Sequence, residues 1–172
     1  MTNANIYWLR DVPTGRIAVM PRPRGGKWLA DEVSGWHCAG LRTVVSLLER
    51  HEVKKLGLRD EPAFCEAVRI EFISFPIPDG GVPLSICNSV RLVAKLASKV
   101  SSGTAVGIHC RAGIGRSALL AGCILSRLGV PEMEVFPCIS RARGVSCPET
   151  EAQVKWFASF LRAEEATGTG SV

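Results

Sequence analysis

Short apolar segments alternate with longer segments of helical periodicity along most of this chain. Apolar runs bounded by glycine, proline or charged residues predict strands at residues 6–9, 16–20, 43–48, 70–75 and 105–109. Apolar residues at helical spacing predict helices at residues 29–39, 84–100, 117–128, 131–144 and 149–165. Strands that alternate with helices indicate an α/β domain, in which helices flank a central and mostly parallel sheet.

The length and composition fit one such domain and exclude several other classes of protein. The chain has 172 residues, of which 47% are hydrophobic and 22% charged, which excludes a disordered chain, a collagen and a small disulfide scaffold. No uncharged run exceeds eleven residues, so we expect no membrane span. We expect a single domain at residues 1–165, followed by a disordered tail at residues 166–172.

The seven cysteines are spaced singly, with no CxxC pair among them. An odd number of cysteines, together with an N-terminus that lacks the features of a signal peptide, favours a reducing, cytoplasmic location over a disulfide framework. The spacing matches no metal-site pattern, so we expect no bound metal. Most of these cysteines should be small buried hydrophobic residues.

Lysine and arginine number 21 against 16 aspartates and glutamates, which gives a net charge of +5. This balance suits an anionic ligand, but it does not distinguish nucleic acid, a membrane surface and a phosphate ester. We expect Arg111, with Arg22, Arg24 and Lys27, to form a basic rim at such a site. The last three could equally be scattered solvated charges.

The segment His109-Cys110-Arg111-Ala112-Gly113-Ile114-Gly115-Arg116-Ser117 follows a predicted strand and begins a predicted helix. α/β sheets bind their ligands at such strand-to-helix turns. Two glycines allow the loop to curl so that its amide groups point inward, and this concave nest binds an anion of the size of phosphate. Arg116 closes the ring with a fork that can bind two phosphate oxygens.

Cys110 lies at the base of this predicted phosphate loop, residues 110–116. A cysteine in such a positive site ionises readily, and the thiolate is the nucleophilic form. We therefore expect Cys110 to attack the phosphorus of a bound phosphate monoester. Ser117 would donate a hydrogen bond to the sulfur, and His109 would order the loop. A buried cysteine beside a packing loop is the alternative, but it explains neither the arginine nor the two glycines.

Such chemistry needs a proton donor for the leaving oxygen, and the chain offers four aspartates. Asp79 lies within Pro76-Ile77-Pro78-Asp79-Gly80-Gly81-Val82-Pro83, between a predicted strand and a long predicted helix. We call residues 76–83 the acid loop, because a loop rich in glycine and proline can present a carboxyl group to a substrate. Asp79 would act first as general acid and then as base for the attacking water. The alternative is an ordinary Asp-Gly turn.

The segment from His109 through Cys110 and Arg116 to Ser117 resembles the HCx5R signature of the cysteine-dependent protein tyrosine phosphatases, and the match is complete. The resemblance implies that residues 110–116 bind the substrate phosphate. It also implies hydrolysis through a cysteinyl-phosphate intermediate, without a metal or other cofactor. The expected fold is that of a dual-specificity phosphatase.

Further motifs are similar to those of the kinase-associated and Cdc14-like dual-specificity phosphatases. The acid loop is one of them, and residues 141–144 and Gln153 resemble the final segment of this group. By this resemblance, Gln153 positions the hydrolytic water, and Arg143 braces the active-site loops or a substrate anion. Glu149 stands where the kinase-associated enzymes carry another glutamine, so the water site differs there. The similarity extends from about residue 40 to residue 160.

The resemblance implies phosphorylated proteins as substrates, with no nucleic-acid partner, and it leaves the oligomeric state open. Tyr7 is the only tyrosine, and no segment resembles the tyrosine-bearing recognition loop of the phosphotyrosine-only enzymes. A shallower pocket would admit phosphoserine and phosphothreonine as well as phosphotyrosine.

Other functions remain possible for the same loop. Phosphatases of phosphoinositides or of RNA 5′-phosphates use it too, although lipid specialists often carry lysines between the cysteine and the arginine. A catalytically silent phosphopeptide-binding module typically lacks the cysteine, the arginine or the acid, and this chain retains all three. A rhodanese-like sulfur transferase usually has four intervening residues, whereas this chain has five.

Overall fold

A five-stranded sheet forms the centre of the computed structural model, which describes residues 5–9 and 15–168. The strand order is β1-β2-β5-β3-β4. The strands are β1 (Tyr7–Leu9), β2 (Arg16–Met20), β3 (Thr43–Ser46), β4 (Glu71–Ser74) and β5 (Ala105–His109). β1 pairs with β2 in the antiparallel sense, and the other three pairings are parallel. The α/β class with a mostly parallel sheet, predicted from the alternating pattern, is confirmed.

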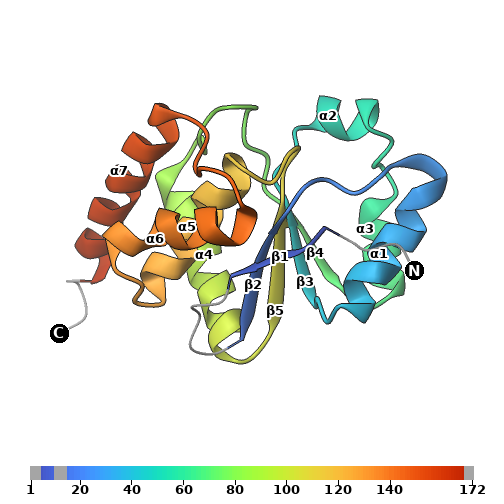
Figure 1. Ribbon diagram of the computed structural model, residues 1–172, viewed down its shortest axis with the longest axis horizontal. Coiled ribbons are helices and arrows are strands. Elements are labelled where there is room, and N and C mark those ends of the chain that lie inside the picture. The colour runs from blue at the N-terminus through green and yellow to red at the C-terminus, as the bar shows by residue number, and fades with distance from the viewer. Residues whose placement is uncertain (1–4, 10–14, 169–172) are drawn as a thin grey trace.

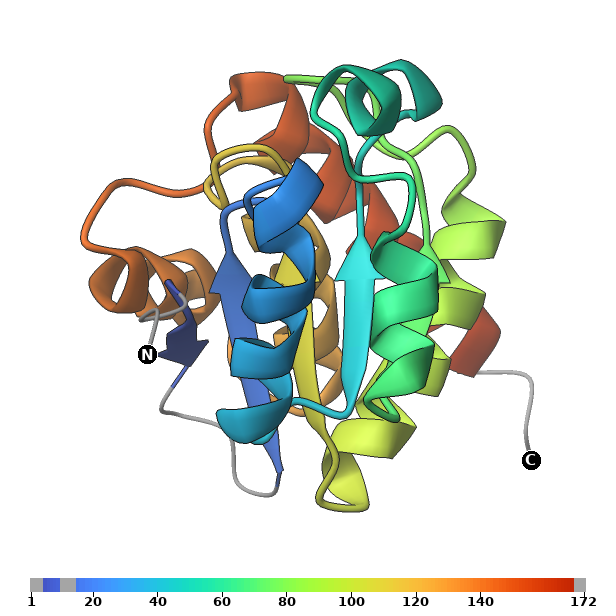
Figure 2. The same ribbon diagram turned by 90° about the vertical axis from the view of Figure 1, so that its right-hand side faces the viewer.

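Helices cover both faces of this sheet, as Figures 1 and 2 show. The helices are η1 (Gly26–Trp28), α1 (Leu29–Cys38), α2 (Arg50–Lys55), α3 (Glu61–Ala67), α4 (Ile86–Ser101), α5 (Arg116–Arg127), α6 (Glu132–Arg143) and α7 (Glu151–Gly168). α1 and α3 pack on one face, and α4, α5, α6 and α7 form the layer on the other (Figure 1). Within the described residues, none of the helices is long and apolar enough to cross a membrane.

The two helical layers explain why the strands read as continuous apolar runs. Val45 and Ile108 belong to the core formed with α4 to α7. Val44, which precedes Val45 in β3, belongs to the core formed with α1 and α3. Every residue of β3 and β5 is therefore buried. A strand with both faces covered has no polar side to alternate with.

Two short helices, α2 and α3, lie in a segment for which the sequence predicted no regular structure. They have six and seven residues, too few to display a helical period. α2 lies at the end of the sheet toward which β2 and β3 run (Figure 2). The predicted strands at residues 43–48 and 70–75 end earlier, at Ser46 and Ser74.

The C-terminal end of the predicted domain, residue 165, falls inside α7. This helix continues to Gly168, so residues 166–168 of the predicted tail are helical. The rest of that tail, residues 169–172, lies outside the described residues. The helix predicted at residues 84–100 begins at Ile86, where the Ser85 hydroxyl accepts a hydrogen bond from the Asn88 amide and caps the helix.

Candidate active site

The phosphate loop lies at the carboxyl end of β5, between the end of this strand and the first residue of α5, Arg116. β5 is the central strand of the sheet, so the loop is flanked by the segments that follow β2 and β3. The Arg22 amide donates to the Arg111 carbonyl at 3.2 Å, and the Leu47 amide donates to the His109 carbonyl at 2.9 Å. The loop is therefore held from both sides.

Both glycines of the loop lie in close contact with neighbouring groups. Gly113 has a φ of +72°, and a Cβ atom there would lie 2.5 Å from the carbonyl carbon of Met20. A Cβ at Gly115 would lie 2.7 Å from Oε2 of Glu149 and 3.0 Å from Nε2 of Gln153. Gly113 thus lets the loop approach β2, and Gly115 leaves room for the two side chains from the C-terminal segment.

Replacement of Gly113 by alanine is expected to lower the free energy of unfolding by about 2 kcal/mol or more, because it combines backbone strain with a clash against main chain. Gly129→Ala is the matched control, since Gly129 has a φ of +93° but a Cβ there would meet no atom within 4 Å. Urea denaturation measures both variants. If Gly113→Ala and Gly129→Ala lose equal free energy of unfolding, the contact of Gly113 with Met20 does not limit which residue fits there.

Cys110 lies at the base of the loop with only 3% of its surface exposed. Its Sγ accepts a hydrogen bond from the Gly113 amide at 3.3 Å, so at least one loop amide points inward. Ser117 is fully buried, and its hydroxyl makes no hydrogen bond within the described part of the chain. The expected donation from this hydroxyl to the sulfur therefore stays a prediction.

Arg116 is buried, and its guanidinium is fixed by several groups. It donates to both carboxylate oxygens of Glu52, at 2.7 and 3.0 Å. It also donates to the carbonyls of Ile77 at 3.0 Å and Leu47 at 3.4 Å, and to Oδ1 of Asp79 at 2.8 Å. The plane of the guanidinium is thereby set by two separate segments of the chain, residues 47–52 and residues 77–79.

Glu52 is a site residue that the sequence did not reveal, and it reaches Arg116 from α2. Burial raises the pKa of Glu52, but hydrogen bonds from Arg116 and from the Glu49 amide outweigh burial and lower the pKa below its usual value. The pKa of Arg116 is raised: burial acts to lower it, but the hydrogen bond to Glu52 and nearby negative charges prevail. A charged pair of this kind keeps the arginine protonated and in place.

His109 contacts Glu61, a second residue that the sequence did not reveal. Its Nε2 lies 2.7 Å from Oε1 of Glu61, and both side chains are buried. The His109 ring also lies near Trp36, with 5.9 Å between ring centroids. These contacts orient the residue that directly precedes Cys110.

Asp79 lies on the acid loop between β4 and α4, with 56% of its side chain exposed. Besides the hydrogen bond to Arg116, its Oδ2 lies 4.0 Å from a guanidinium nitrogen of Arg111. The structure therefore brings the predicted acid to the predicted phosphate-binding arginine, 37 positions away in the sequence. A carboxylate in this position is within reach of a substrate held by the loop.

Gln153 is fully buried and connects the acid loop with the start of α7. Its Oε1 accepts hydrogen bonds from the amides of Glu149 and Thr150, at 3.1 and 3.2 Å. Its Nε2 donates to the Gly81 carbonyl at 3.1 Å and lies beside Gly115. Gln153 thus lies between the acid loop and the phosphate loop.

Arg143, at the end of α6, contacts the phosphate loop from its outer side. It donates to the carbonyls of Gly113 at 3.2 Å and Ala112 at 3.0 Å. Its guanidinium also lies 4.1 Å from the centre of the Tyr7 ring. Of the two roles expected for Arg143, this geometry supports bracing of the loop.

The predicted basic rim is only partly assembled around the loop. Arg111 lies beside Asp79, and the Arg22 amide is bonded to Arg111. Arg24 is paired with Glu32. The Lys27 ammonium lies 4.9 Å from the centre of the Trp28 ring. Arg111 is therefore the rim cation that contacts the acid.

The other cysteines differ from Cys110 in their environment. Burial raises the pKa of Cys65 to about 12, and it raises the pKa of Cys123 and Cys147 as well. Cys38 and Cys87 are exposed, and none of the seven cysteines forms a disulfide. In the ranges that the structure describes, no three histidine, cysteine or acidic side chains are grouped so that they could hold a metal ion.

Comparisons with known proteins identify the family of this chain. The model of the family described as "Polymorphic toxin system, DSP-PTPase phosphatase" matches residues 18–130. Cyclin-dependent kinase inhibitor 3 of Rattus norvegicus is 27% identical over 124 residues, which are 71% of this chain and 58% of that protein. The chain thus spans little more than half the length of this curated relative.

Solved structures resemble the whole described fold. One is kinase associated phosphatase (KAP) with its catalytic cysteine replaced by serine, with a TM-score of 0.81 and 20% identity over 93% of this chain and 95% of that chain. Another is PTPMT1 in complex with PI(5)P, with a TM-score of 0.72 and 18% identity over 88% and 94% of the two chains. The matched family model covers more than half of the chain and includes the entire phosphate loop, so the chain belongs to the DSP-PTPase family of cysteine-dependent dual-specificity phosphatases.

Proposed function

We propose that this chain hydrolyses phosphate monoesters on phosphoproteins, without a metal ion and through a cysteinyl-phosphate intermediate. The observation that carries the proposal is that Arg116 joins the phosphate loop to the acid loop. Its guanidinium meets the acid loop at Asp79, and the phosphate loop that it closes contains Cys110 with an inward Gly113 amide. These contacts support one site in which Cys110 is the nucleophile, Arg116 the phosphate clamp and Asp79 the acid.

In the first step, the Cys110 thiolate attacks phosphorus, and the bond from phosphorus to the ester oxygen breaks. Arg116 and the loop amides hold the remaining phosphate oxygens and stabilise the charge that they carry in the transition state. Asp79 in its protonated form gives its proton to the leaving oxygen, so the alcohol or phenol departs neutral. The phosphoryl group stays on sulfur.

In the second step, a water molecule attacks the phosphocysteine. Asp79, now ionised, takes a proton from this water, and the thiolate leaves as inorganic phosphate forms. Gln153 lies beside Gly115 and the acid loop. From this position its amide orients the attacking water. Because Glu149 lies at the same glycine, this part of the site carries a carboxylate as well as an amide.

Protein substrates are supported by the family description, which names a DSP-PTPase, and by the similarity to kinase associated phosphatase. The five residues between Cys110 and Arg116 contain one arginine and no lysine. The PI(5)P complex of PTPMT1 supports a phosphoinositide as the competing substrate class. We expect phosphotyrosine to be accepted, together with phosphoserine and phosphothreonine.

The experiment that tests this proposal compares kcat/KM across substrate classes in the presence of EDTA. The panel contains para-nitrophenyl phosphate, peptides with phosphotyrosine, phosphoserine or phosphothreonine, a soluble short-chain PI(5)P and a 5′-phosphorylated RNA. We expect turnover in EDTA, with phosphopeptides preferred. If kcat/KM is at least tenfold higher for the lipid or the RNA than for the phosphopeptides, the proposal of protein substrates is overturned. If no substrate is hydrolysed, the proposal of phosphatase activity is overturned.

Asp79→Asn is expected to lower kcat on a phosphotyrosine peptide by about a hundredfold, because a general acid contributes about 10²–10⁴ in rate. KM should stay the same or fall, since the variant removes a negative charge from Arg116. Steady-state kinetics measure both constants, with Asp31→Asn on α1 as the matched control. An unchanged kcat would exclude Asp79 as the proton donor.

A further inference from the structure

A cavity of about 440 Å³ lies between α2, α3 and the ends of β3 and β4. Its lining includes none of residues 109–117, so it is separate from the phosphate loop. Figure 2 shows this region, with α2 above α3 at the end of the sheet. The volume is within the range of cavities that hold small-molecule ligands, about 300–1,000 Å³.

Three cations line this cavity without any partner. Arg50, Lys54 and Arg59 are exposed, and no described residue forms an ion pair or a side-chain hydrogen bond with them. Glu61 is the carboxylate of the lining, and its Oε1 is bonded to His109. The lining therefore carries three cations and one carboxylate, and this net positive charge favours an anion.

The rest of the lining is largely apolar. Leu48 and Leu58 are buried, and Val53 and Phe72 are partly buried and pack against the core beneath α1 and α3. Such a surface gains free energy when an apolar group covers it. We propose that this cavity is a second ligand site, which takes a small molecule with one anionic group on a compact apolar body.

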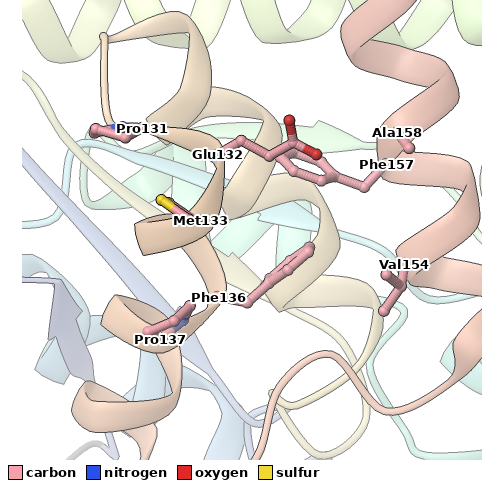
Figure 3. A pocket seen from close by; sticks show the side chains of 8 residues that line it. All are labelled: Pro131, Glu132, Met133, Phe136, Pro137, Val154, Phe157 and Ala158. Carbon is pink, nitrogen blue, oxygen red and sulfur yellow. The ribbon is translucent and has the colours of Figure 1, made fainter.

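A second cavity of about 660 Å³, between α6 and α7, provides a contrast (Figure 3). Its lining includes Met133 and Phe136 from α6 and Val154 from α7, and its one charged residue is the acidic Glu132. An anion is disfavoured there. The two cavities therefore differ in the ligand charge that they accept, although both are apolar.

The elements around the cationic cavity also contact residues of the proposed active site. Leu48 and Val53 line the cavity, while their neighbours Leu47 and Glu52 bind Arg116. Glu61, in the cavity wall, binds His109. A bound ligand therefore restrains the segments that position the phosphatase site, and we expect it to change kcat/KM. This second half of the proposal rests on the proposed function.

The binding test uses 2-naphthoate as the probe and isothermal titration calorimetry as the measurement. We expect one saturable site in the wild-type protein. Lys54→Gln/Arg59→Gln should raise Kd at least tenfold, whereas Arg91→Gln/Lys155→Gln, which removes two exposed cations from α4 and α7, should leave Kd within twofold. The neutral analogue 2-naphthylmethanol should bind at least tenfold more weakly than 2-naphthoate.

Four results would overturn the second site, and the first three concern the probe and the double variants. They are no saturable binding, an equal loss of affinity in both double variants, and complete competition by inorganic phosphate, which would place the probe in the phosphate loop. A loss of affinity in Met133→Gln, with none in Lys54→Gln/Arg59→Gln, would place the probe between α6 and α7 and overturn the site as well. None of these results depends on catalytic activity.

The coupling to catalysis is tested with para-nitrophenyl phosphate at saturating 2-naphthoate. We expect kcat/KM to change at least twofold in the wild type and to stay constant in Lys54→Gln/Arg59→Gln. Unchanged kinetics at full occupancy would overturn the coupling. If the wild type hydrolyses no phosphate ester, the proposed function fails, while the binding result stands by itself.

Discussion

Cys110→Ser is expected to reduce the hydrolysis of para-nitrophenyl phosphate by about four orders of magnitude or more. A serine hydroxyl at this position is not ionised at neutral pH, so the group that attacks phosphorus is lost. The loop itself should persist, because serine is close to cysteine in size and the surrounding contacts involve main chain and Arg116. Losses of this size are typical when a catalytic nucleophile is removed from an intact site.

The control is Cys87→Ser, which makes the same change at an exposed cysteine at the start of α4. Its turnover should stay within twofold of the wild type. Inorganic phosphate should still bind to Cys110→Ser, which titration calorimetry can measure. Substantial turnover by Cys110→Ser would mean that another group carries the phosphoryl transfer.

Glu52→Ala is expected to lower the free energy of unfolding by about 3–5 kcal/mol, because it leaves the buried Arg116 charge without its main partner. The guanidinium would also lose its bidentate support, so kcat/KM should fall in the fraction that remains folded. Urea denaturation gives the stability, and para-nitrophenyl phosphate gives the activity. Glu66→Ala, an exposed change on α3, should alter stability by no more than about 0.5 kcal/mol.

The stability that Glu52 contributes should depend on pH in a defined direction. Its pKa is lowered on folding from an ordinary value of 4.5, so the contribution is complete above that value. It is lost as the pH falls through the lower pKa of the folded state. The difference in unfolding free energy between the wild type and Glu52→Gln should therefore be constant near neutral pH and shrink in acid. A constant difference down to strongly acid pH would contradict this account.

The sheet and the longer helices could be predicted from the sequence because each carries a strong local pattern. The strand at residues 105–109 is a continuous apolar run, and the strand-to-helix turn after it contains two glycines and an arginine at fixed spacing. These residues lie close together in the sequence, so roles could be predicted for Cys110 and Arg116 before any contact was known. Asp79 could be predicted as the general acid because the chain has only four aspartates.

Glu52 and Glu61 could not be predicted, because their roles come from contacts across the fold. Both belong to a charged segment that resembles solvated surface, and α2 and α3 are too short for helical periodicity to reveal. Glu52 contacts a residue 64 positions away, and Glu61 one 48 positions away. The spacing of Glu49 and Glu52 was the available signal, since these two residues form a capping box at α2.

The support of Arg116 has a consequence for how the chain folds. Its bonds to Leu47, Glu52 and Asp79 join residues 69, 64 and 37 positions apart. Contacts of such high sequence separation form only when the chain has reached its native topology, because the entropy of closing long loops must be overcome first. A collapsed intermediate with native helices would therefore lack a formed phosphate clamp. Regain of activity during refolding should coincide with the last cooperative step.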